Sequence, residues 1–370
     1  MRRKLLLFII LGFFALQLGS TASPVEAKPM DSDKKQMIEA REKFFGKEHV
    51  NHKTGAIRKD KVILSWFGVS NFAAAINGHV VLLDSWVPRG TSTGYVPTSS
   101  DELAQLKPEA LFLGHAHFDH AADAAEIISK SGAKLVGTPE HCDYIKGQVE
   151  EDVDVACIHA VPEDAEIGTT SQLSFLKGVE ITAVKHIHSD LKPNDLSDPS
   201  KPLLTVTDLS YAVEHPAKPK EFKKLLHSAL TDEEGGSLLY QFKVGKFNLT
   251  WNDSAGPIKE DAPELTNVLG DLPKADVQVG AIMGFNQFTN GLRDPRMYIE
   301  ALQPKVFVPT HHDNWAPPIT TKGINYQEAL ETELERLPKS KRPTLRFISD
   351  PDDYVKPEKL TFSINDRKWK

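Results

Sequence analysis

The residues best suited to chemistry lie in one short segment, HAHFDH at positions 115–120, directly after an apolar, strand-like run and a glycine. In an extended backbone, residues two apart face the same side, so His115 and His117 can bind one metal ion as a pair. Asp119 and His120 begin a helical pattern, so the chain turns there and can direct both side chains toward a second ion. We therefore expect this one loop to serve two metal ions.

The ligand types indicate which metals and which chemistry to expect. Imidazole and carboxylate groups without thiolate suit zinc, and manganese and iron use the same ligands. Two Zn²⁺ ions per chain are therefore the expected cofactor, with Mn²⁺ or iron as alternatives. Two such ions, about 3.5 to 4 Å apart, can share a water, lower its pKa toward neutrality and supply hydroxide without a protein nucleophile. The segment thus favours an enzyme over a histidine-rich surface loop.

The elements that must position this segment alternate between strand-like and helical patterns. Strand-like runs are expected at residues 62–67, 72–76, 79–83, 110–113, 134–136, 180–184, 238–251, 277–282 and 305–308. Helical patterns are clearest at residues 119–130, 219–230, 295–302 and 326–337. Because each sheet must bury one face on its partner and cover the other, we predict an α/β fold, a four-layer αββα sandwich.

The N-terminus has the form of a secretory signal peptide, which we expect to comprise residues 1–27. Three basic residues at positions 2–4 precede an apolar run at 5–18, and a small-residue cleavage site follows. The apolar run is shorter than the roughly 20 residues of a membrane-spanning helix, so no permanent membrane span is expected. The mature protein would then be secreted or extracytoplasmic.

After the signal peptide, three parts follow. Residues 28–60 are expected to form an N-terminal arm, and residues 61–370 the catalytic domain. An insertion at about 189–235 interrupts that domain; its first part is rich in Pro, Asp, Ser and Lys, as in loops that serve as lids. The two cysteines, Cys142 and Cys157, are compatible either with one disulfide or with two separate buried thiols.

Charge excludes one class of partner. The whole chain has a formal net charge of −7, and removal of residues 1–27 would change it to −9, because three basic residues and one glutamate are lost. An acidic surface has no electrostatic footprint for a phosphate backbone, so no nucleic-acid partner is expected.

The segment at 115–120 resembles the HxHxDH motif of the metallo-β-lactamase-like hydrolases, and the family's other positions follow in order over about residues 61–315. Asp84, after a strand-like run, matches the aspartate that supports the metal loop. His188, Asp253 and His311 match the family's remaining ligands. The resemblance implies that His115, His117 and His188 bind the first ion, that Asp119, His120 and His311 bind the second, and that Asp253 bridges them.

Several assignments keep an alternative. His186 lies two residues before His188 on the same strand face, where it could orient a ligand instead. His312 neighbours His311 and is a candidate proton donor to the leaving group. Asp119 would steer the attacking hydroxide, so the expected catalytic residues are Asp119, Asp253 and His312. Asp253 could instead be a turn residue, and Asp84 a solvated strand end.

The resemblance implies cleavage of an ester, lactone or phosphodiester bond in a small-molecule or lipid-like substrate. Trp66-Phe67-Gly68 and Pro309-Thr310-His311 resemble the branch that holds ascorbate-6-phosphate lactonase and N-acyl phosphatidylethanolamine phospholipase D. An iron-dependent persulfide dioxygenase, a β-lactamase and a binding protein without catalysis are the alternatives. A β-lactamase fits less well, because a bridging aspartate is typical of the other hydrolases. Asn71, Asn314 and Trp315 are candidates for the substrate pocket.

Overall fold

The computed structural model describes residues 30–87, 95–203, 232–314 and 320–369, together with isolated positions at 213, 219, 223, 227 and 230. The expected signal peptide and most of the expected helix at 219–230 lie outside the described residues. Within the described ranges, every helix is too short or too polar to cross a membrane.

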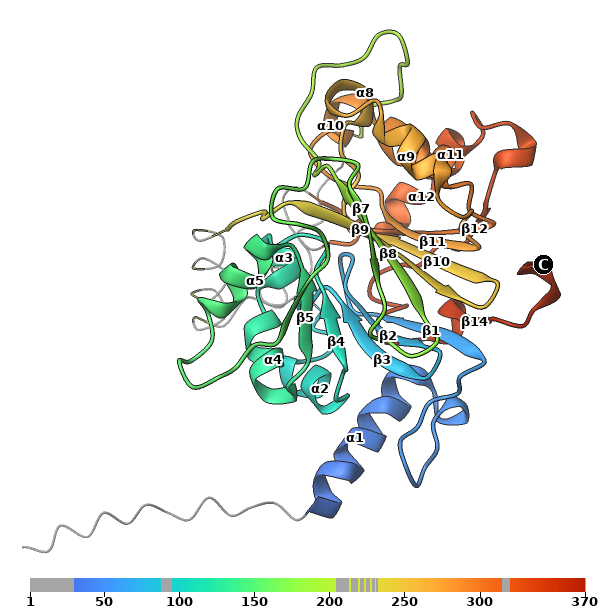
Figure 1. The fold of residues 1–370 in the computed structure, drawn as a ribbon. Helices are drawn as coiled ribbons and strands as arrows, with labels where there is room; N and C mark the ends of the chain where they lie inside the picture. Colours follow the sequence, from blue (N-terminus) through green and yellow to red (C-terminus); the bar gives the residue numbers. More distant parts are fainter. Residues whose placement is uncertain are drawn as a thin grey trace, which may run out of the picture.

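In the described part of the chain, two mixed sheets of seven strands each form the centre of the molecule (Figure 1). The first contains, in chain order, β1 (Lys61–Trp66), β2 (Phe72–Ile76), β3 (His79–Leu83), β4 (Ala110–Phe112), β5 (Lys134–Gly137), β6 (Cys157–His159) and β14 (Thr361–Ser363). The second contains β7 (Thr170–Leu173), β8 (Glu180–His186), β9 (Ser237–Val244), β10 (Phe247–Asn252), β11 (Val277–Ala281), β12 (Val306–Thr310) and β13 (Thr344–Leu345).

The strand order gives both sheets the same plan. The orders are β14-β1-β2-β3-β4-β5-β6 and β13-β12-β11-β10-β9-β8-β7. In the first sheet, β3 through β6 pair in parallel and the other pairings are antiparallel. In the second, β10 through β13 pair in parallel and the rest are antiparallel. The carboxyl ends of the parallel strands therefore lie together at one edge of each sheet.

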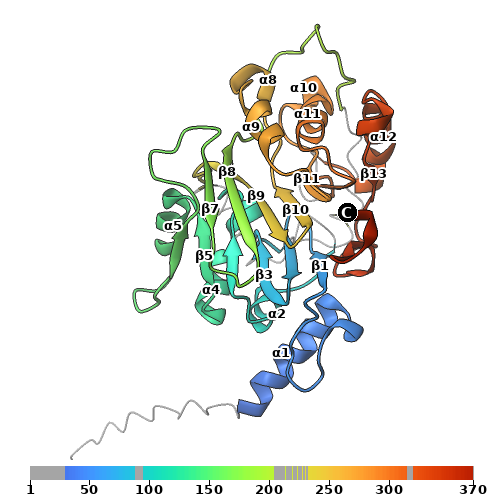
Figure 2. The same ribbon diagram turned by 45° about the vertical axis from the view of Figure 1, so that its right-hand side comes forward.

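Helices cover the outer face of each sheet (Figure 2). They are α1 (Met30–Phe45), α2 (Ser100–Gln105), α3 (Phe118–Ala121), α4 (Ala124–Ser131), α5 (Pro139–Lys146), α8 (Ile258–Asp261), α9 (Leu265–Asp271), α10 (Gln287–Asn290), α11 (Arg293–Leu302) and α12 (Gln327–Leu334). Apolar side chains of α1, α2, α4 and α5 pack on the first sheet. Those of α8, α9, α11 and α12 pack on the second. This confirms the predicted αββα sandwich.

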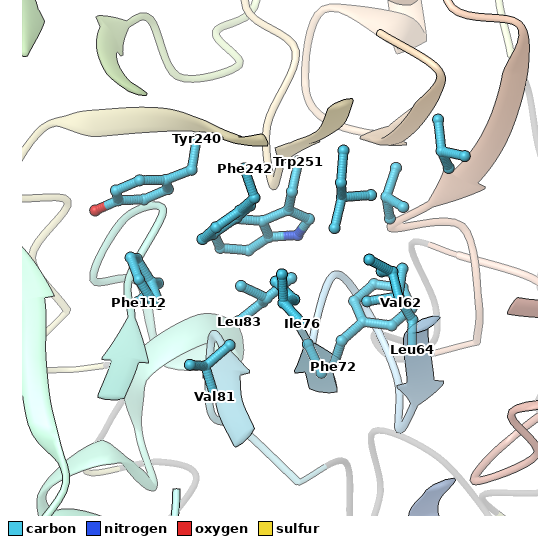
Figure 3. Packing of buried hydrophobic residues seen from close by; sticks show 14 of the residues in the cluster. Val62, Leu64, Phe72, Ile76, Val81, Leu83, Phe112, Tyr240, Phe242 and Trp251 are labelled. Carbon is cyan, nitrogen blue, oxygen red and sulfur yellow. The ribbon is translucent and has the colours of Figure 1, made fainter. Parts of the chain in front are cut away.

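Large apolar side chains fill the space between the sheets (Figure 3). Phe112 of β4 meets Tyr240 and Phe242 of β9 edge to face, with ring centroids 5.2 and 5.1 Å apart, and Trp251 of β10 stacks beside Tyr240. Each such side chain contributes on the order of 2 kcal/mol by burial. The contacts hold the two sheets in one relative position, which in turn aligns their edges.

Two local expectations differ from the structure. The helix expected at 119–130 is divided into α3 and α4, because Asp123 leaves the helical hydrogen-bond pattern: its backbone N–H donates to Ser85 O and its carboxylate accepts from Val87 N. The run expected as one strand at 238–251 is the hairpin of β9 and β10, which turns at Gly245 with a φ of 60°.

The two ends of the described chain both join the first layer. In the region expected as an N-terminal arm, Phe44 and Phe45 of α1 are fully buried, and Arg41 donates to Leu106 O and Gly55 O. Near the other end, β14 pairs with β1. The arm region therefore packs on the first sheet.

Candidate metal centre

The residues expected to bind metal follow the ends of strands at one edge of the sandwich. From the first sheet come Asp84 after β3 and the 115–120 segment after β4. From the second come His188 after β8, Asp253 after β10 and His311 after β12. Because the carboxyl ends of these strands share an edge, residues distant in sequence meet there.

One group consists of His115, His117 and His188. Their ring centroids are 4.6 to 4.7 Å apart, and one ligand atom from each lies within 4.8 Å of the others. Three imidazoles at this spacing match the protein ligands of a tetrahedral zinc site with one open position.

A second group consists of Asp119, His120 and His311. Asp119 Oδ2 lies 3.3 Å from the Nε2 atoms of both histidines. Those two Nε2 atoms are 3.2 Å apart. Three ligand atoms thus converge on one point, as a second metal ion requires.

Asp253 lies between the two groups. Its Oδ2 is 2.6 Å from Nδ1 of His115 and 3.4 Å from Nδ1 of His120. Its Oδ1 is buried without a hydrogen-bond partner among the described residues. A buried carboxylate oxygen left in this way is costly unless it binds a cation. The position suits a ligand that bridges two ions.

The histidine loop is held by the segment 232–238, which runs beside it. Leu238 N donates to Gly114 O at 2.7 Å, Ala116 N to Glu234 O at 2.8 Å, and Phe118 N to Asp232 Oδ1 at 2.7 Å. These backbone contacts fall on alternate residues of the loop. The side chains of the residues between them, His115 and His117, therefore lie together on the side of the metal site.

The segment 232–238 is itself anchored by α5. His141 Nδ1 accepts from Thr138 N, so its Nε2–H donates to Glu234 O and Gly236 O. Thr138 Oγ1 donates to Gly235 O at 2.7 Å. The next residue, Cys142, forms a disulfide with Cys157 of β6, which is one of the two alternatives left open by the sequence. The disulfide links α5 to the first sheet.

Asp84 supports the histidine loop by contacts to the backbone of Gly114 and the side chain of His120. Its Oδ1 accepts from Gly114 N at 3.0 Å, and its Oδ2 lies 2.6 Å from Nδ1 of His120. It is fully buried and adopts a left-handed φ of 56°. A carboxylate on Nδ1 leaves Nε2 of His120 directed at the second group, which is how carboxylates orient metal-binding histidines.

Burial, repulsion between the imidazoles and attraction between imidazoles and carboxylates together set the electrostatics of the cluster. Burial alone would lower the pKa of His120, but Asp119 and Asp84 raise that pKa well above its usual value. Burial, followed by the neighbouring imidazoles, lowers the pKa of His115 well below its usual value. Burial and then His117 lower the pKa of His188 to about 3. Burial alone would raise the pKa of Asp119, but His120 and His311 beside it hold that pKa well below the usual range. Neutral imidazoles and an ionised carboxylate are the forms that bind metal.

The structure distinguishes His188 from His186 and His311 from His312, the two choices of candidate ligand that the sequence left open. β8 ends at His186, so strand alternation does not extend to His188; His186 instead contacts Tyr298 Oη of α11 at 2.9 Å. His312, the candidate proton donor, is not among the described residues that line the cavity; it follows His311, whose backbone is left-handed with a φ of 60°. It is fully buried, and its ring stacks on Phe347. The expectation that His312 donates a proton is therefore not supported.

The expected pocket residues are placed elsewhere. Asn71 donates to Asp119 O and accepts from Trp86 N, so it braces the backbone of the metal loop. Asn314 is buried and donates from its backbone to Asp350. Trp315 lies outside the described residues. None of the three is among the described residues that line the cavity at the metal centre.

That cavity has a volume of about 260 Å³ and opens beside both ligand groups. Part of its wall is apolar, formed by Phe118, Met283, Phe285 and Phe288, and part is polar, formed by Ser189, Asp232 and Thr320. Reasoning from the sequence missed these residues. Ser189 and Asp232 lie in the expected insertion, Phe118 and Phe288 lie on the short helices α3 and α10, and the others lie on connections, so no shared local pattern distinguishes them.

The donor set fits metal ions. Asp84, Asp119 and Asp253 are buried within one small region, and none of the described residues lining the cavity is Lys or Arg. Positive charge that compensates buried carboxylates must then come from protonated histidine or from bound cations. Histidine and carboxylate ligands without thiolate suit divalent zinc, manganese or iron.

Comparison with known proteins gives three findings. Residues 66–245 match the sequence profile of the Metallo-beta-lactamase superfamily. A UPF0173 metal-dependent hydrolase of Methanopyrus kandleri is 24% identical over 268 residues, 72% of this chain and 91% of that protein; one of Methanosphaera stadtmanae is 22% identical over 253 residues, 68% and 84%. Igni18, a metallo hydrolase from Ignicoccus hospitalis, is 16% identical, with a TM-score of 0.49 and coverage of 78% and 95%.

Gly114 provides a test of the close approach between the sheets. A Cβ atom at this position would lie 2.1 Å from Cγ of Asp253. We expect Gly114→Ala to displace Asp253 and weaken metal affinity at least about ten-fold, measured by elemental analysis after dialysis. Gly270→Ala is the matched control, because no atom lies within 4 Å of a Cβ there. Full retention of metal by Gly114→Ala would contradict the prediction.

His141 provides a test of the support for the histidine loop. Burial lowers the pKa of His141 to about 4, against about 6.5 in an unfolded chain. Its contribution to stability is therefore complete above about pH 6.5 and is lost as the pH falls toward 4. Between pH 7.5 and 5, metal-free wild type should lose about 2 kcal/mol more unfolding free energy than His141→Gln, measured by urea denaturation. Equal losses in both proteins would show that His141 does not carry this dependence.

Proposed function

Because this chain carries a metallo-β-lactamase superfamily domain, we propose that it is a hydrolase which works with two divalent metal ions and cleaves an ester, lactone or phosphodiester bond. Metal dependence and hydrolysis agree with the metal-dependent hydrolases that it resembles. The observation that carries the two-ion proposal is that Asp253 lies between two separate three-ligand groups.

The ligands divide between the ions as follows. His115, His117 and His188 would hold the first ion, Asp119, His120 and His311 the second, with Asp253 shared. Held by these residues, two such ions would supply Lewis-acid chemistry, namely a lower pKa for a shared water and polarisation of the oxygen of the bond to be cleaved. Zinc is the metal that we propose, with manganese or iron as alternatives, because the donors are imidazole and carboxylate.

The protein's own residues supply orientation. Asp84 holds Nδ1 of His120, so the ring can offer only Nε2 to the cavity. Asp119 Oδ2 stands at 3.3 Å from two imidazoles and lines the cavity, where it can direct a water toward the substrate. Asn71 and the segment 232–238 hold the backbone on which these side chains are mounted. Such fixed donors and acceptors need little rearrangement during reaction.

The cavity wall indicates the kind of substrate. Phe118, Met283, Phe285 and Phe288 line the cavity beside the ligands, and Phe285 is 53% exposed. Apolar and aromatic side chains are the usual lining of pockets that bind small molecules. We infer that the substrate joins a hydrolysable group to an apolar part such as an acyl chain, so that it is lipid-like or a small hydrophobic molecule.

We place this hydrolase outside the cytoplasm. The sequence of residues 1–27 has the form of a signal peptide. The disulfide between Cys142 and Cys157 supports the same location, since disulfides persist in oxidising compartments.

Metal content and activity together test the proposal. The purified protein should contain close to two zinc ions and hydrolyse an aryl ester, a lactone or bis-p-nitrophenyl phosphate. Chelation should abolish the activity and Zn²⁺ should restore it. His117→Ala should lower kcat/KM at least about a hundred-fold, whereas His159→Ala, which changes an exposed histidine outside the cluster, should not. One iron ion per chain and no hydrolysis would contradict the proposal.

The apolar wall can be tested separately with aryl esters of increasing chain length. Phe285→Ala should raise the KM for a long-chain ester about ten-fold, because burial of an aromatic contact is worth on the order of 1 to 2 kcal/mol, and should leave the acetyl ester unchanged. Ile324→Ala is a suitable control, since Ile324 is equally exposed but is not among the described lining residues. An equal effect on both esters would exclude Phe285 from chain recognition.

A further inference from the structure

Among the described residues around the metal centre, three other than glycine adopt a left-handed backbone: Val69 with φ 52°, Asp84 with φ 56° and His311 with φ 60°. For a β-branched residue such as valine this conformation is strained, and it persists only where surrounding contacts enforce it. Val69 binds no metal in the arrangement above. The contacts that hold it therefore need a separate explanation.

The contacts that hold Val69 come from Asp313. Both carboxylate oxygens of this fully buried residue accept the backbone N–H of Val69, each at 3.1 Å. On its other side, Val69 O accepts the backbone N–H of His311 at 3.0 Å and Nε1–H of Trp66 at 2.9 Å. Val69 thus links the carboxylate of Asp313 to the backbone of His311.

Tyr354 fixes the carboxylate in turn. Its hydroxyl donates to Oδ2 of Asp313 at 2.5 Å. Its ring lies 4.6 Å from that of Trp66 and stacks on Tyr95 at 5.5 Å, and the next residue, Val355, donates its N–H to Trp66 O. The loop after β1, the loop after β12 and the segment around residue 354 therefore meet at Asp313.

His311 has a particular need for such support. The other two members of its group, Asp119 and His120, are neighbours on α3, so their relative positions are set locally. His311 comes from the opposite sheet, 191 residues after His120. The second ion therefore depends on the accuracy with which the loop after β12 presents this one imidazole.

We propose that Asp313, held by Tyr354, is a positioning residue for the metal ligand His311 and acts through the strained backbone of Val69. The proposal rests on the assignment of His311 to a second ion. It predicts that loss of the carboxylate weakens the second ion selectively, because His115, His117 and His188 make no hydrogen bond to this cluster among the bonds of the described residues.

The test is a zinc titration of the metal-free full chain by calorimetry, with folding followed by circular dichroism. Asp313→Asn keeps the size of the side chain but turns an N–H toward that of Val69 or the Tyr354 hydroxyl. It should weaken the second ion about ten-fold or more and leave the first unchanged. Tyr354→Phe, which keeps the ring, should produce a smaller loss in the same direction.

Asp276→Asn is the matched control. Asp276 is also a buried carboxylate, which accepts from Asn248 N at 2.9 Å and pairs with Lys305. It precedes β11, whereas Ala281 at the far end of that strand pairs with Thr310 beside His311. This variant should lower thermal stability without changing the affinity for either ion.

The outcomes separate the two proposals. Unchanged binding of the second ion by Asp313→Asn, equal weakening of both ions, or the same change in Asp276→Asn would overturn the role of Asp313. If Asp313→Asn does not fold, unchanged second-ion affinity in Tyr354→Phe would overturn it. A wild type that binds one ion would overturn it as well. A wild type that binds two ions but hydrolyses nothing would refute the proposed function and leave the titration result valid.

Discussion

The contact between Asp253 and the histidine loop joins the two halves of the sandwich at the point where chemistry can occur. Asp253 ends a strand of the second sheet, and His115 follows a strand of the first, yet their side chains meet at 2.6 Å. Gly114 makes this approach possible, because a Cβ atom there would overlap the carboxylate. The ligands from both sheets can converge only while this separation is kept. The packing of Phe112 against Tyr240 and Phe242 maintains it.

The close approach of the two sheets also brings several carboxylates together in a buried region. Asp84, Asp119 and Asp253 are buried near the five imidazoles of the cluster, and burial lowers the pKa values of His115 and His188. Carboxylates without a compensating cation would destabilise the fold strongly. Metal ions would remove that cost, so we expect metal binding and stability to be coupled in this protein.

Support for the centre comes from outside it, on two sides. The segment 232–238 holds the histidine loop and is anchored through His141 to α5 and its disulfide. On the opposite side, Asp313 and Tyr354 reach His311 through Val69. In both places the supporting residue contacts backbone and not the ligand side chain. Restraint of the backbone limits where a ligand can move while its imidazole stays available for metal.

Local patterns along the chain were enough to predict the αββα layers and to single out the 115–120 loop, whose side chains the fold brings together with the other candidate ligands, because alternation and helical periodicity depend on neighbours in sequence. The same patterns left open the choice between His186 and His188 and the choice between His311 and His312 as candidate ligands. The structure groups His188 and His311 with the other candidate ligands. In that arrangement β8 ends at His186, and His311 has a left-handed backbone. The break at Asp123, the apolar cavity wall and the link from Asp313 to Val69 were not predicted. Each arises from contacts between segments far apart in sequence, which exist only after the two sheets have packed together.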